Sequence, residues 1–213
     1  GHTTTHSYDA LNRRTATTDA LGHTTTTLYD AVGRVAASTD AAGRTTAFAY
    51  DAGNHLVLVT DAAGGIVQYT YDGNGNRLTV TDPNGNTTAH VYDALNRLTQ
   101  KTEPLGHVTA YSYDAVGNRT ARTDAKGQVT NYSYDALDRR SGIDYASQPD
   151  VSFAYDAVGN LTQMTDGLGT TRHGYDSRNR RISTEDPFGN TVGYVYDAQG
   201  NRTMLTYPGN KVV

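Results

Sequence analysis

The dipeptide Tyr-Asp recurs along this chain at an almost constant spacing. It begins at Tyr8, Tyr29, Tyr50, Tyr71, Tyr92, Tyr113, Tyr134, Tyr155, Tyr175 and Tyr196. Every step is 21 residues, except the step of 20 between Tyr155 and Tyr175. A fixed period of this length is typical of a repeat protein, in which one small unit packs on copies of itself. The spacing therefore predicts a tandem array of ten Tyr-Asp units.

Each repeat contains two turn signals. The first follows the tyrosine, where the fourth residue after Tyr is always Asn, Gly or Asp, the residues that tolerate a positive φ. The second is D-x-x-G, as in Asp19–Gly22 and Asp82–Gly85. Asp in the first position of such a turn bonds the backbone two residues on, and Gly closes it. Two turns in 21 residues leave two strands of about five to seven residues, so each repeat is expected to be a β-hairpin.

Three sets of residues in these slots are assigned a structural role. The first set is the ten tyrosines. The second set is the aspartates that follow them: Asp9, Asp30, Asp51, Asp72, Asp93, Asp114, Asp135, Asp156, Asp176 and Asp197. The third set is the second-turn glycines: Gly22, Gly43, Gly64, Gly85, Gly106, Gly127, Gly169 and Gly189.

The strand that ends at each Tyr-Asp alternates with a period of two. In the repeat that ends at Tyr50, Phe48 and Thr46 share the tyrosine's parity, while Ala47 and Ala49 fall between them. This period places the aromatic residues on one face of a strand and the small residues on the other. Stacked repeats are then expected to form ladders of aromatic neighbours, each pair adding about 0.5–1.5 kcal/mol. On this basis Tyr113→Ala is expected to destabilise the array by roughly a few kcal/mol.

Two repeats depart from the pattern. The seventh repeat has "DYASQPD" at Asp144–Asp150 in place of the T-D-x-x-G turn, and the last has Thr206-Tyr207 in place of Thr-Asp. We expect a bulge, a bend or a docking surface at these turns, or simply a tolerated loop variant. The chain also begins and ends in the middle of a repeat. Residues 1–213 are therefore interpreted as a single array cut from a longer protein.

Composition and charge exclude several classes of function. The net charge of −4 does not suit an electrostatic nucleic-acid binder, which needs a basic stripe. No apolar run is long enough to span a membrane, and no signal peptide is visible. The absence of Cys excludes disulfides and thiolate metal sites. We expect no cofactor.

Candidate metal and catalytic residues follow the repeat rather than a site. Three histidines take the aromatic slot two residues before Tyr, three follow the second-turn Gly, and one takes a slot of Arg or Asn. They are, in that order, His6, His90 and His173; His2, His23 and His107; and His55. The acidic turn "DGNGN" at Asp72–Asn76 lacks the Gly and Glu of an EF-hand loop, which leaves only weak Ca²⁺ binding as an alternative. No catalytic constellation stands out, so the segment is not expected to be an enzyme. N-x-[ST] sequons occur at Asn86, Asn118, Asn131, Asn160 and Asn201.

The wording of the repeat, with "YDALNRLT" from Tyr92 and "YDAVGNRT" from Tyr113, resembles the YD repeat of Rhs proteins, and equally that of toxin-complex shells, wall-associated proteins and teneurins. The resemblance covers the whole chain. It implies an all-β fold in which tandem hairpins form an antiparallel spiral sheet, an arc of a hollow β-shell around a C-terminal toxin. "DPFGNTVGYVYD" at Asp186–Asp197 superficially fits the D-P-x-G-x-x-x-G motif of the family's self-cleaving block, but it is a repeat variant at normal phase. No cleavage residue is therefore assigned.

The resemblance implies a non-catalytic scaffold in a large exported protein, secreted or at the bacterial cell surface. Its partners would be the remainder of its own shell, the enclosed toxin and a secretion-system component. One alternative is an extracellular carbohydrate-binding or adhesive protein, since tyrosine faces and amide-bearing turns suit sugars. The other is a self-assembling extracellular fibre or tube built through open strand edges.

Overall fold

The computed structural model describes residues 3–209 and 211–213, and the regular structure of these residues is all β-strand. The chain divides into two compact units, Gly1–Val108 and Thr109–Val213. The described residues contain no helix that is long and apolar enough to cross a membrane. The all-β fold predicted from the two turn signals in each repeat is therefore confirmed.

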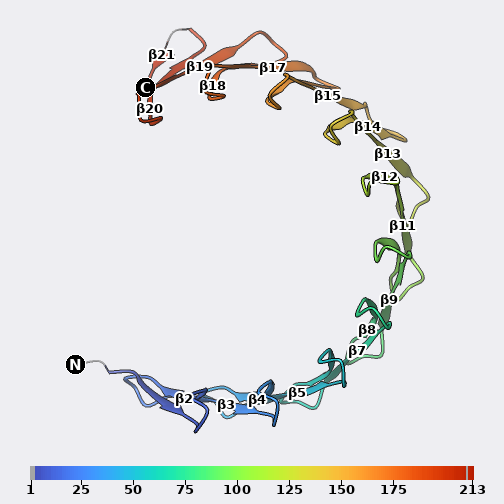
Figure 1. Ribbon diagram of the computed structural model, residues 1–213, viewed down its shortest axis with the longest axis vertical. Coiled ribbons are helices and arrows are strands. Elements are labelled where there is room, and N and C mark those ends of the chain that lie inside the picture. The colour runs from blue at the N-terminus through green and yellow to red at the C-terminus, as the bar shows by residue number, and fades with distance from the viewer. Residues whose placement is uncertain (1–2, 210) are drawn as a thin grey trace. The chain divides into compact units, whose positions relative to one another are not determined.

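The first unit is a run of antiparallel strands, each paired with the next along the chain (Figure 1). Its strands are β1 (Thr5–Tyr8), β2 (Arg14–Thr18), β3 (Thr24–Tyr29), β4 (Val35–Thr39), β5 (Thr45–Tyr50), β6 (Leu56–Thr60), β7 (Ile66–Tyr71), β8 (Arg77–Thr81), β9 (Thr87–Tyr92) and β10 (Leu98–Thr102). Each odd-numbered strand ends at the tyrosine of a Tyr-Asp pair, so the Tyr-Asp turns all lie at the same end of the hairpins.

The second unit repeats this arrangement, and β11 begins at the last residue of the first unit. Its strands are β11 (Val108–Tyr113), β12 (Arg119–Thr123), β13 (Val129–Tyr134), β14 (Arg140–Tyr145), β15 (Val151–Tyr155), β16 (Leu161–Asp166), β17 (Gly169–Tyr175), β18 (Arg181–Glu185), β19 (Thr191–Tyr196), β20 (Arg202–Tyr207) and β21 (Lys211–Val212). Consecutive strands again pair antiparallel, from β11–β12 to β20–β21.

The two kinds of turn have the same backbone geometry. In the first repeat, Asn12 N–H donates to the carbonyl of Asp9, and Asp9 N–H donates to the carbonyl of Arg13, both at 3.0 Å. Gly22 and Asp19 form the same pattern in the second turn. This is the three-residue hairpin loop, a type I turn followed by one residue in the left-handed region. All ten residues in the slot four after Tyr have a positive φ, as the sequence predicted.

Every Tyr-Asp hairpin contains a β-bulge beside its turn, on the strand that follows the turn. In the first hairpin, Tyr8 pairs with Arg14 while Ser7 pairs with Ala16, so the second strand has one residue more. The same shift occurs in each hairpin of both units. A bulge interrupts the ladder and increases the local twist. The strand that follows the turn therefore begins with a backbone carbonyl that needs another partner.

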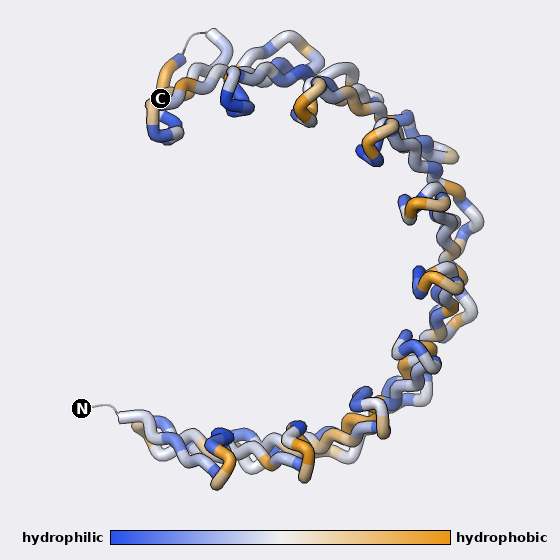
Figure 2. Tube along the Cα trace, viewed as in Figure 1, coloured by the Kyte–Doolittle hydropathy of each residue, from blue (hydrophilic) through white to orange (hydrophobic). Residues whose placement is uncertain are grey.

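Each unit, taken by itself, lacks a buried core in the part that the structure describes. Among the described residues, no side chain is fully buried. The predicted alternation is visible as a difference between half-buried and exposed side chains: in β5, Thr46, Phe48 and Tyr50 are half-buried, whereas the residues between them are exposed. Figure 2 shows hydrophobic residues at several turns as well as within the strands. Leu137, in the turn after Tyr134, is 67 % exposed. Contacts between neighbouring hairpins must therefore provide much of the stability.

Candidate functional site

The Tyr-Asp turns are the most elaborate hydrogen-bonded feature of the molecule. In the first of them, Asp9 Oδ1 accepts the backbone N–H groups of Leu11 at 3.0 Å and Arg13 at 2.9 Å. Asp9 Oδ2 accepts from Arg13 Nε at 2.7 Å. One carboxylate therefore satisfies two backbone donors and fixes the direction of the arginine. This is the turn-making role assigned to Asp9 from the sequence, and the other Tyr-Asp aspartates lie in the corresponding turns.

These hydrogen bonds stabilise the charged form of the carboxylates. At Asp9 the largest contribution is the donation by the Arg13 backbone N–H, which lowers the pKa, whereas partial desolvation opposes it. At Asp156 the largest contribution is the side-chain amide of Asn160, which again lowers the pKa. Hydrogen bonds to a carboxylate favour its ionised form. The turns are therefore built around charged aspartates at neutral pH.

In several Tyr-Asp turns, the residue that pairs with the aspartate also reaches the next repeat. The guanidinium of Arg13 lies over the ring of Tyr29 with 4.6 Å between its Cζ and the ring centroid. The same contact joins Arg34 to Tyr50, Arg139 to Tyr155 and Arg180 to Tyr196, at 4.5, 4.6 and 4.8 Å. His55 takes this slot in the third repeat and stacks on Tyr71 with the centroids 4.7 Å apart. Each such pair is a favourable cation–π or ring contact between consecutive hairpins.

The tyrosine hydroxyls complete the connection between hairpins. The ladder between β2 and β3 stops at Ala16 and Thr26, so the carbonyl of Arg14, at the bulge, lies beyond it. This carbonyl accepts the hydroxyl of Tyr29 at 3.0 Å. The equivalent bond is donated by Tyr50, Tyr71, Tyr92, Tyr134, Tyr155, Tyr175 and Tyr196, at 2.9–3.2 Å. The tyrosine side chain thus pairs a backbone group that the bulge removes from the ladder.

Consecutive turns differ in a regular way. The residue with positive φ is Asn or Asp in the odd-numbered repeats (Asn12, Asn54, Asn96, Asp138 and Asn179) and Gly in the even-numbered ones (Gly33, Gly75, Gly117, Gly159 and Gly200). From the fourth repeat on, Asn follows each of these glycines, and three such side chains donate to the oxygen of the next odd-numbered turn. These bonds join Asn76 to Asn96, Asn118 to Asp138 and Asn160 to Asn179, at 2.7, 2.9 and 3.1 Å. The donor and acceptor turns therefore alternate with a period of two repeats.

We name this connected set the turn ladder. It comprises, in each repeat, the tyrosine, the aspartate after it, the residue with positive φ and the residue that follows that one. The tyrosines and aspartates of the ladder were singled out from the sequence. The clamping residues, such as Arg139 and Asn118, were not. Their signal was the alternation of Asn-Arg and Gly-Asn at the ends of successive turns.

The second turns connect their hairpins through different contacts. Threonine hydroxyls lie opposite each other beside several of them, as in Thr18–Thr24 and Thr81–Thr87, at 2.8 Å. Seven second-turn glycines have φ between 78° and 86°: Gly22, Gly43, Gly64, Gly85, Gly106, Gly127 and Gly189. Gly169, the eighth glycine of this set, has φ 126° because Asp166 pairs directly with it, which shortens the loop.

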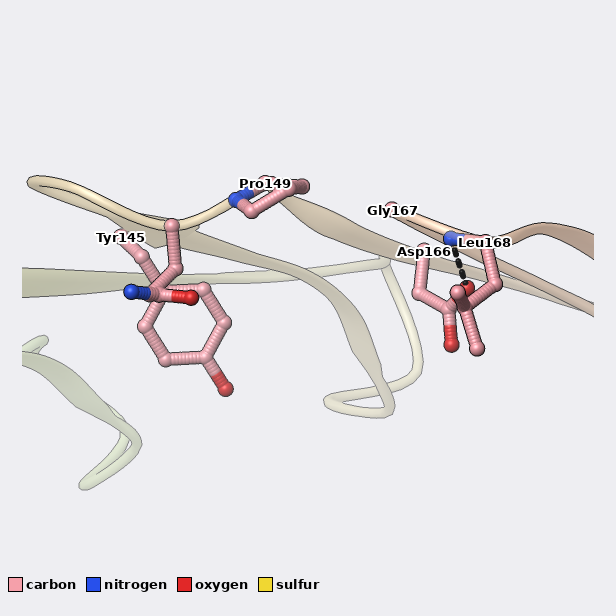
Figure 3. A pocket seen from close by; sticks show the side chains of 6 residues that line it. Tyr145, Pro149, Asp166, Gly167 and Leu168 are labelled. Carbon is pink, nitrogen blue, oxygen red and sulfur yellow. Dashed lines mark hydrogen bonds between the residues drawn. The ribbon is translucent and has the colours of Figure 1, made fainter.

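The variant turn of the seventh repeat borders a shallow pocket of about 570 Å³. It is lined by Tyr145, Gln148, Pro149, Asp166, Gly167 and Leu168 (Figure 3). The Asp166 carboxylate is already bonded to the backbone N–H of Leu168 at 2.8 Å. A Cβ atom on Gly167 would lie 2.7 Å from Cγ of Pro149. The pocket is therefore a contact between neighbouring loops, and it contains no convergent set of polar groups.

Several of the remaining candidate residues form hydrogen bonds to neighbouring residues of the turns and strands. His23 and His55 each bond a turn aspartate at 3.0 Å, and His6 lies 3.1 Å from the hydroxyl of Thr17. His2 lies outside the described residues. Asp72, which opens "DGNGN", accepts three hydrogen bonds from Asn74 and Asn76. Within residues 3–209 and 211–213, no three His, Asp or Glu side chains form a group that could hold a metal ion.

Comparisons with known proteins agree with this architecture. The family model described as the teneurin YD-shell matches residues 2–211. Two similar solved structures are entitled "Crystal Structure of TcdB2-TccC3" and "Crystal Structure of TcdB2-TccC3-Cdc42". Both are 17 % identical and cover 97 % of this chain and 14 % of theirs, with TM-scores of 0.68 and 0.66. A third, of the Photorhabdus luminescens Tc holotoxin pore, is 16 % identical, covers 98 % of this chain and 18 % of its own, and has a TM-score of 0.57. No curated protein sequence matches this chain.

Proposed function

Since this chain belongs to the teneurin YD-shell family, whose shell is a structural scaffold, we propose that it is a wall section of a shell that encloses a C-terminal toxin. Residues 1–213 would act as one continuous array within that longer protein. The chain spans less than a fifth of the length of the solved chains that it resembles. The activity of the enclosed toxin and its export therefore belong to this proposal. So do the partners, namely the rest of the shell and a component of the secretion system, and a secreted or cell-surface location.

The turn ladder is the observation that supports a wall rather than a binding site. Its tyrosines donate their hydroxyls to backbone carbonyls, and five of their rings are covered by a cation or an imidazole of the preceding repeat. A sugar-binding tyrosine needs a free ring face or a free hydroxyl. The carbohydrate-binding alternative is weakened because these groups already bind the neighbouring hairpin.

Protection of the downstream polypeptide in the full-length protein tests this proposal. We expect the segment after the repeats to resist a protease in the intact protein. Gly117→Val and Gly159→Val together should expose it, because both glycines have a positive φ, of 104° and 99°, that Val does not tolerate. The matched control is Val116→Gln with Val158→Gln, at tip residues of the same two turns that are 72 % and 69 % exposed.

The readout is the rate at which peptides of the downstream segment appear in mass spectrometry. The proposal requires slow release from the wild type and the control, and fast release from the glycine variant. Release from the wild type at the rate of the isolated downstream segment would refute encapsulation.

A further inference from the structure

Most of the arginines of this chain fall into two structural classes. The arginines of the turns bond a turn aspartate, with nitrogen–oxygen distances of 2.7 Å at Arg13, Arg34, Arg44, Arg139 and Arg180. A second class occupies the slot six residues after Tyr, at the start of a strand, and comprises Arg14, Arg77, Arg119, Arg140, Arg181 and Arg202. In the described part of the chain, none of this second class has a carboxylate within 4.0 Å.

Members of the second class gather with tyrosines on one face of the second unit. The guanidiniums of Arg119 and Arg140 both lie 4.8 Å from the ring centroid of Tyr132, and Arg119 lies 5.7 Å from that of Tyr111. Arg122 pairs with Tyr111 across β11 and β12, so its side chain is on the same face. We name these five residues, on strands β11 to β14, the arginine–tyrosine patch.

The patch carries three positive charges and no acid. Its nearest strand carboxylate, Asp144, pairs with Asn131 and accepts its side-chain amide at 3.1 Å. Asn131 alternates with Tyr132 along β13, so Asp144 belongs to the opposite face. The other acids of these hairpins are in turns, such as Asp124 and Asp135. The three arginines are half-buried, so their charges are partly shielded from water without a counter-ion.

The rings do not satisfy the hydrogen-bond donors of these arginines. The Nε atoms of Arg119 and Arg140 are buried and have no hydrogen-bond partner. A guanidinium has five N–H donors and no acceptor, and contact with a ring face uses none of them. Burying an unpaired polar group is unfavourable. The stacked geometry therefore leaves the terminal nitrogens as the groups through which an external anion can compensate the charge.

We propose that the arginine–tyrosine patch is a docking surface for an extended, acidic polypeptide segment. Carboxylates suit it because guanidinium and carboxylate form two parallel hydrogen bonds in a fixed plane. Arg119 and Arg122 are three positions apart on one strand, and Arg119 and Arg140 are two strands apart. Both separations are roughly 10 Å from standard strand geometry. An extended peptide with Asp or Glu at every second or third position presents charges at a comparable spacing.

The surroundings favour a short acidic peptide over a nucleic acid. The whole chain has a net charge of −4, and the turns that flank the patch contain Asp124 and Asp135. A long polyanion that crosses the patch would meet these carboxylates at both ends of the strands. The tyrosine rings also offer apolar surface to the aliphatic parts of a peptide. The docking proposal does not rest on the proposed shell function, because it uses only contacts between residues of the second unit.

Binding of a labelled peptide tests the proposal. The probe is a fluorescein-labelled octapeptide of alternating Glu and Gly, and fluorescence anisotropy measures its affinity for the whole chain at low and moderate salt. The patch variant is Arg119→Gln with Arg122→Gln and Arg140→Gln. The matched control is Lys126→Gln with Arg172→Gln and Lys211→Gln, which removes the same charge at exposed residues outside the patch. We expect at least a tenfold loss of affinity in the patch variant and less than a twofold loss in the control.

Two further variants keep the test decisive. Among the described residues, the ring contacts of the patch are made by Arg119 and Arg140, so Arg122→Gln alone is expected to preserve the fold and still weaken binding at least threefold. Arg119→Lys with Arg140→Lys keeps the charge but not the planar donor pair, and we expect an intermediate loss. Circular dichroism and the urea midpoint establish that each variant is folded.

Three results would overturn the proposal. The first is no binding of the probe by the wild type. The second is an equal loss in the patch and control variants, which would mean a response to net charge alone. The third is equally tight binding of an oligothymidylate of the same charge, which would make the patch a general anion surface. Failure here would leave the protease-protection result unaffected, so the two proposals are tested separately.

Discussion

Replacing Tyr155 by Phe isolates the hydrogen bond that joins a tyrosine to the bulge of the preceding repeat. The Tyr155 hydroxyl donates to the carbonyl of Arg140 at 2.9 Å, whereas its ring lies 4.6 Å from the Arg139 guanidinium. Phe keeps the ring and removes only the hydroxyl. The net value of such a bond is about 0.5–1.5 kcal/mol. Because Tyr155 is half-buried, water can reach part of this site, so we expect a loss of about 1 kcal/mol in the free energy of unfolding.

Tyr155→Ala removes the ring as well. A fully buried aromatic residue truncated to Ala costs about 3–5 kcal/mol, and a half-buried one should cost roughly half of that. The cation–π contact with Arg139 adds about 0.5–1 kcal/mol. The expected total for Tyr155→Ala is therefore roughly 2–3.5 kcal/mol, clearly more than for Phe.

Urea denaturation followed by circular dichroism measures both variants, with Val158→Gln, a turn tip that is 69 % exposed, as a control expected to change little. The slope of each transition must stay that of the wild type, because repeat arrays can lose cooperativity. A Phe variant as stable as the wild type would refute the reasoning that the bulge carbonyl needs the hydroxyl. Equal losses for Phe and Ala would show instead that the ring contributes nothing.

Three further predictions concern the turns and strands. Gly167→Ala should destabilise the second unit by roughly 1–3 kcal/mol in urea denaturation, since its Cβ would overlap Pro149, while Gly73→Ala, with open space around it, should change little. The aspartates of the Tyr-Asp turns and Asp82 have a lowered folded pKa, so they stabilise the fold fully above the ordinary value of 3.8 and the urea midpoint should fall as the pH drops below it; Asp82→Asn should reduce this dependence, and an unchanged slope would contradict it. His90 has its pKa lowered from 6.5 by burial and by Arg77 and Lys101, so stability should decrease as the pH falls through 6.5 toward the folded pKa; His90→Phe should reduce that decrease in a pH series of urea midpoints, while His173, whose pKa is also lowered by burial, keeps part of it.

Much of the fold was predictable because each repeat contains a recognisable sequence signal for each of its two turns. Positive φ at Asn96 and Gly117, the loop at Asp19–Gly22 and the alternating faces of β5 all follow from local chemistry repeated in phase. The proposed destabilisation by Tyr113→Ala remains a prediction, as does the reading of residues 1–213 as a single array. The turns and strands could be predicted because the same local sequence signals recur in each of the ten repeats.

The contacts between repeats were harder to predict. The β-bulge beside each turn is a shift in register between the strand that ends at Tyr8 and the strand that begins at Arg14. No residue type in the sequence marks this shift. Without the bulge, the role of the Tyr29 hydroxyl cannot be deduced. The two classes of arginine likewise share one residue type and differ only in their position relative to the turn. Position within the repeat, rather than residue type, decides what each side chain contacts.

The alternation of donor and acceptor turns has a consequence for how such a chain can change its length. Loss of a single repeat, such as the 21 residues from Asp114 to Tyr134, would place the turn of Asn96 beside that of Asp138. Arg97 would then take the place from which Asn118 now donates to Asp138. An arginine in this slot can make the same connection, because Arg34 donates to the Oδ1 of Asn54 at 2.7 Å. We therefore expect the array to tolerate the loss or duplication of single 21-residue repeats wherever this slot carries Arg or Asn.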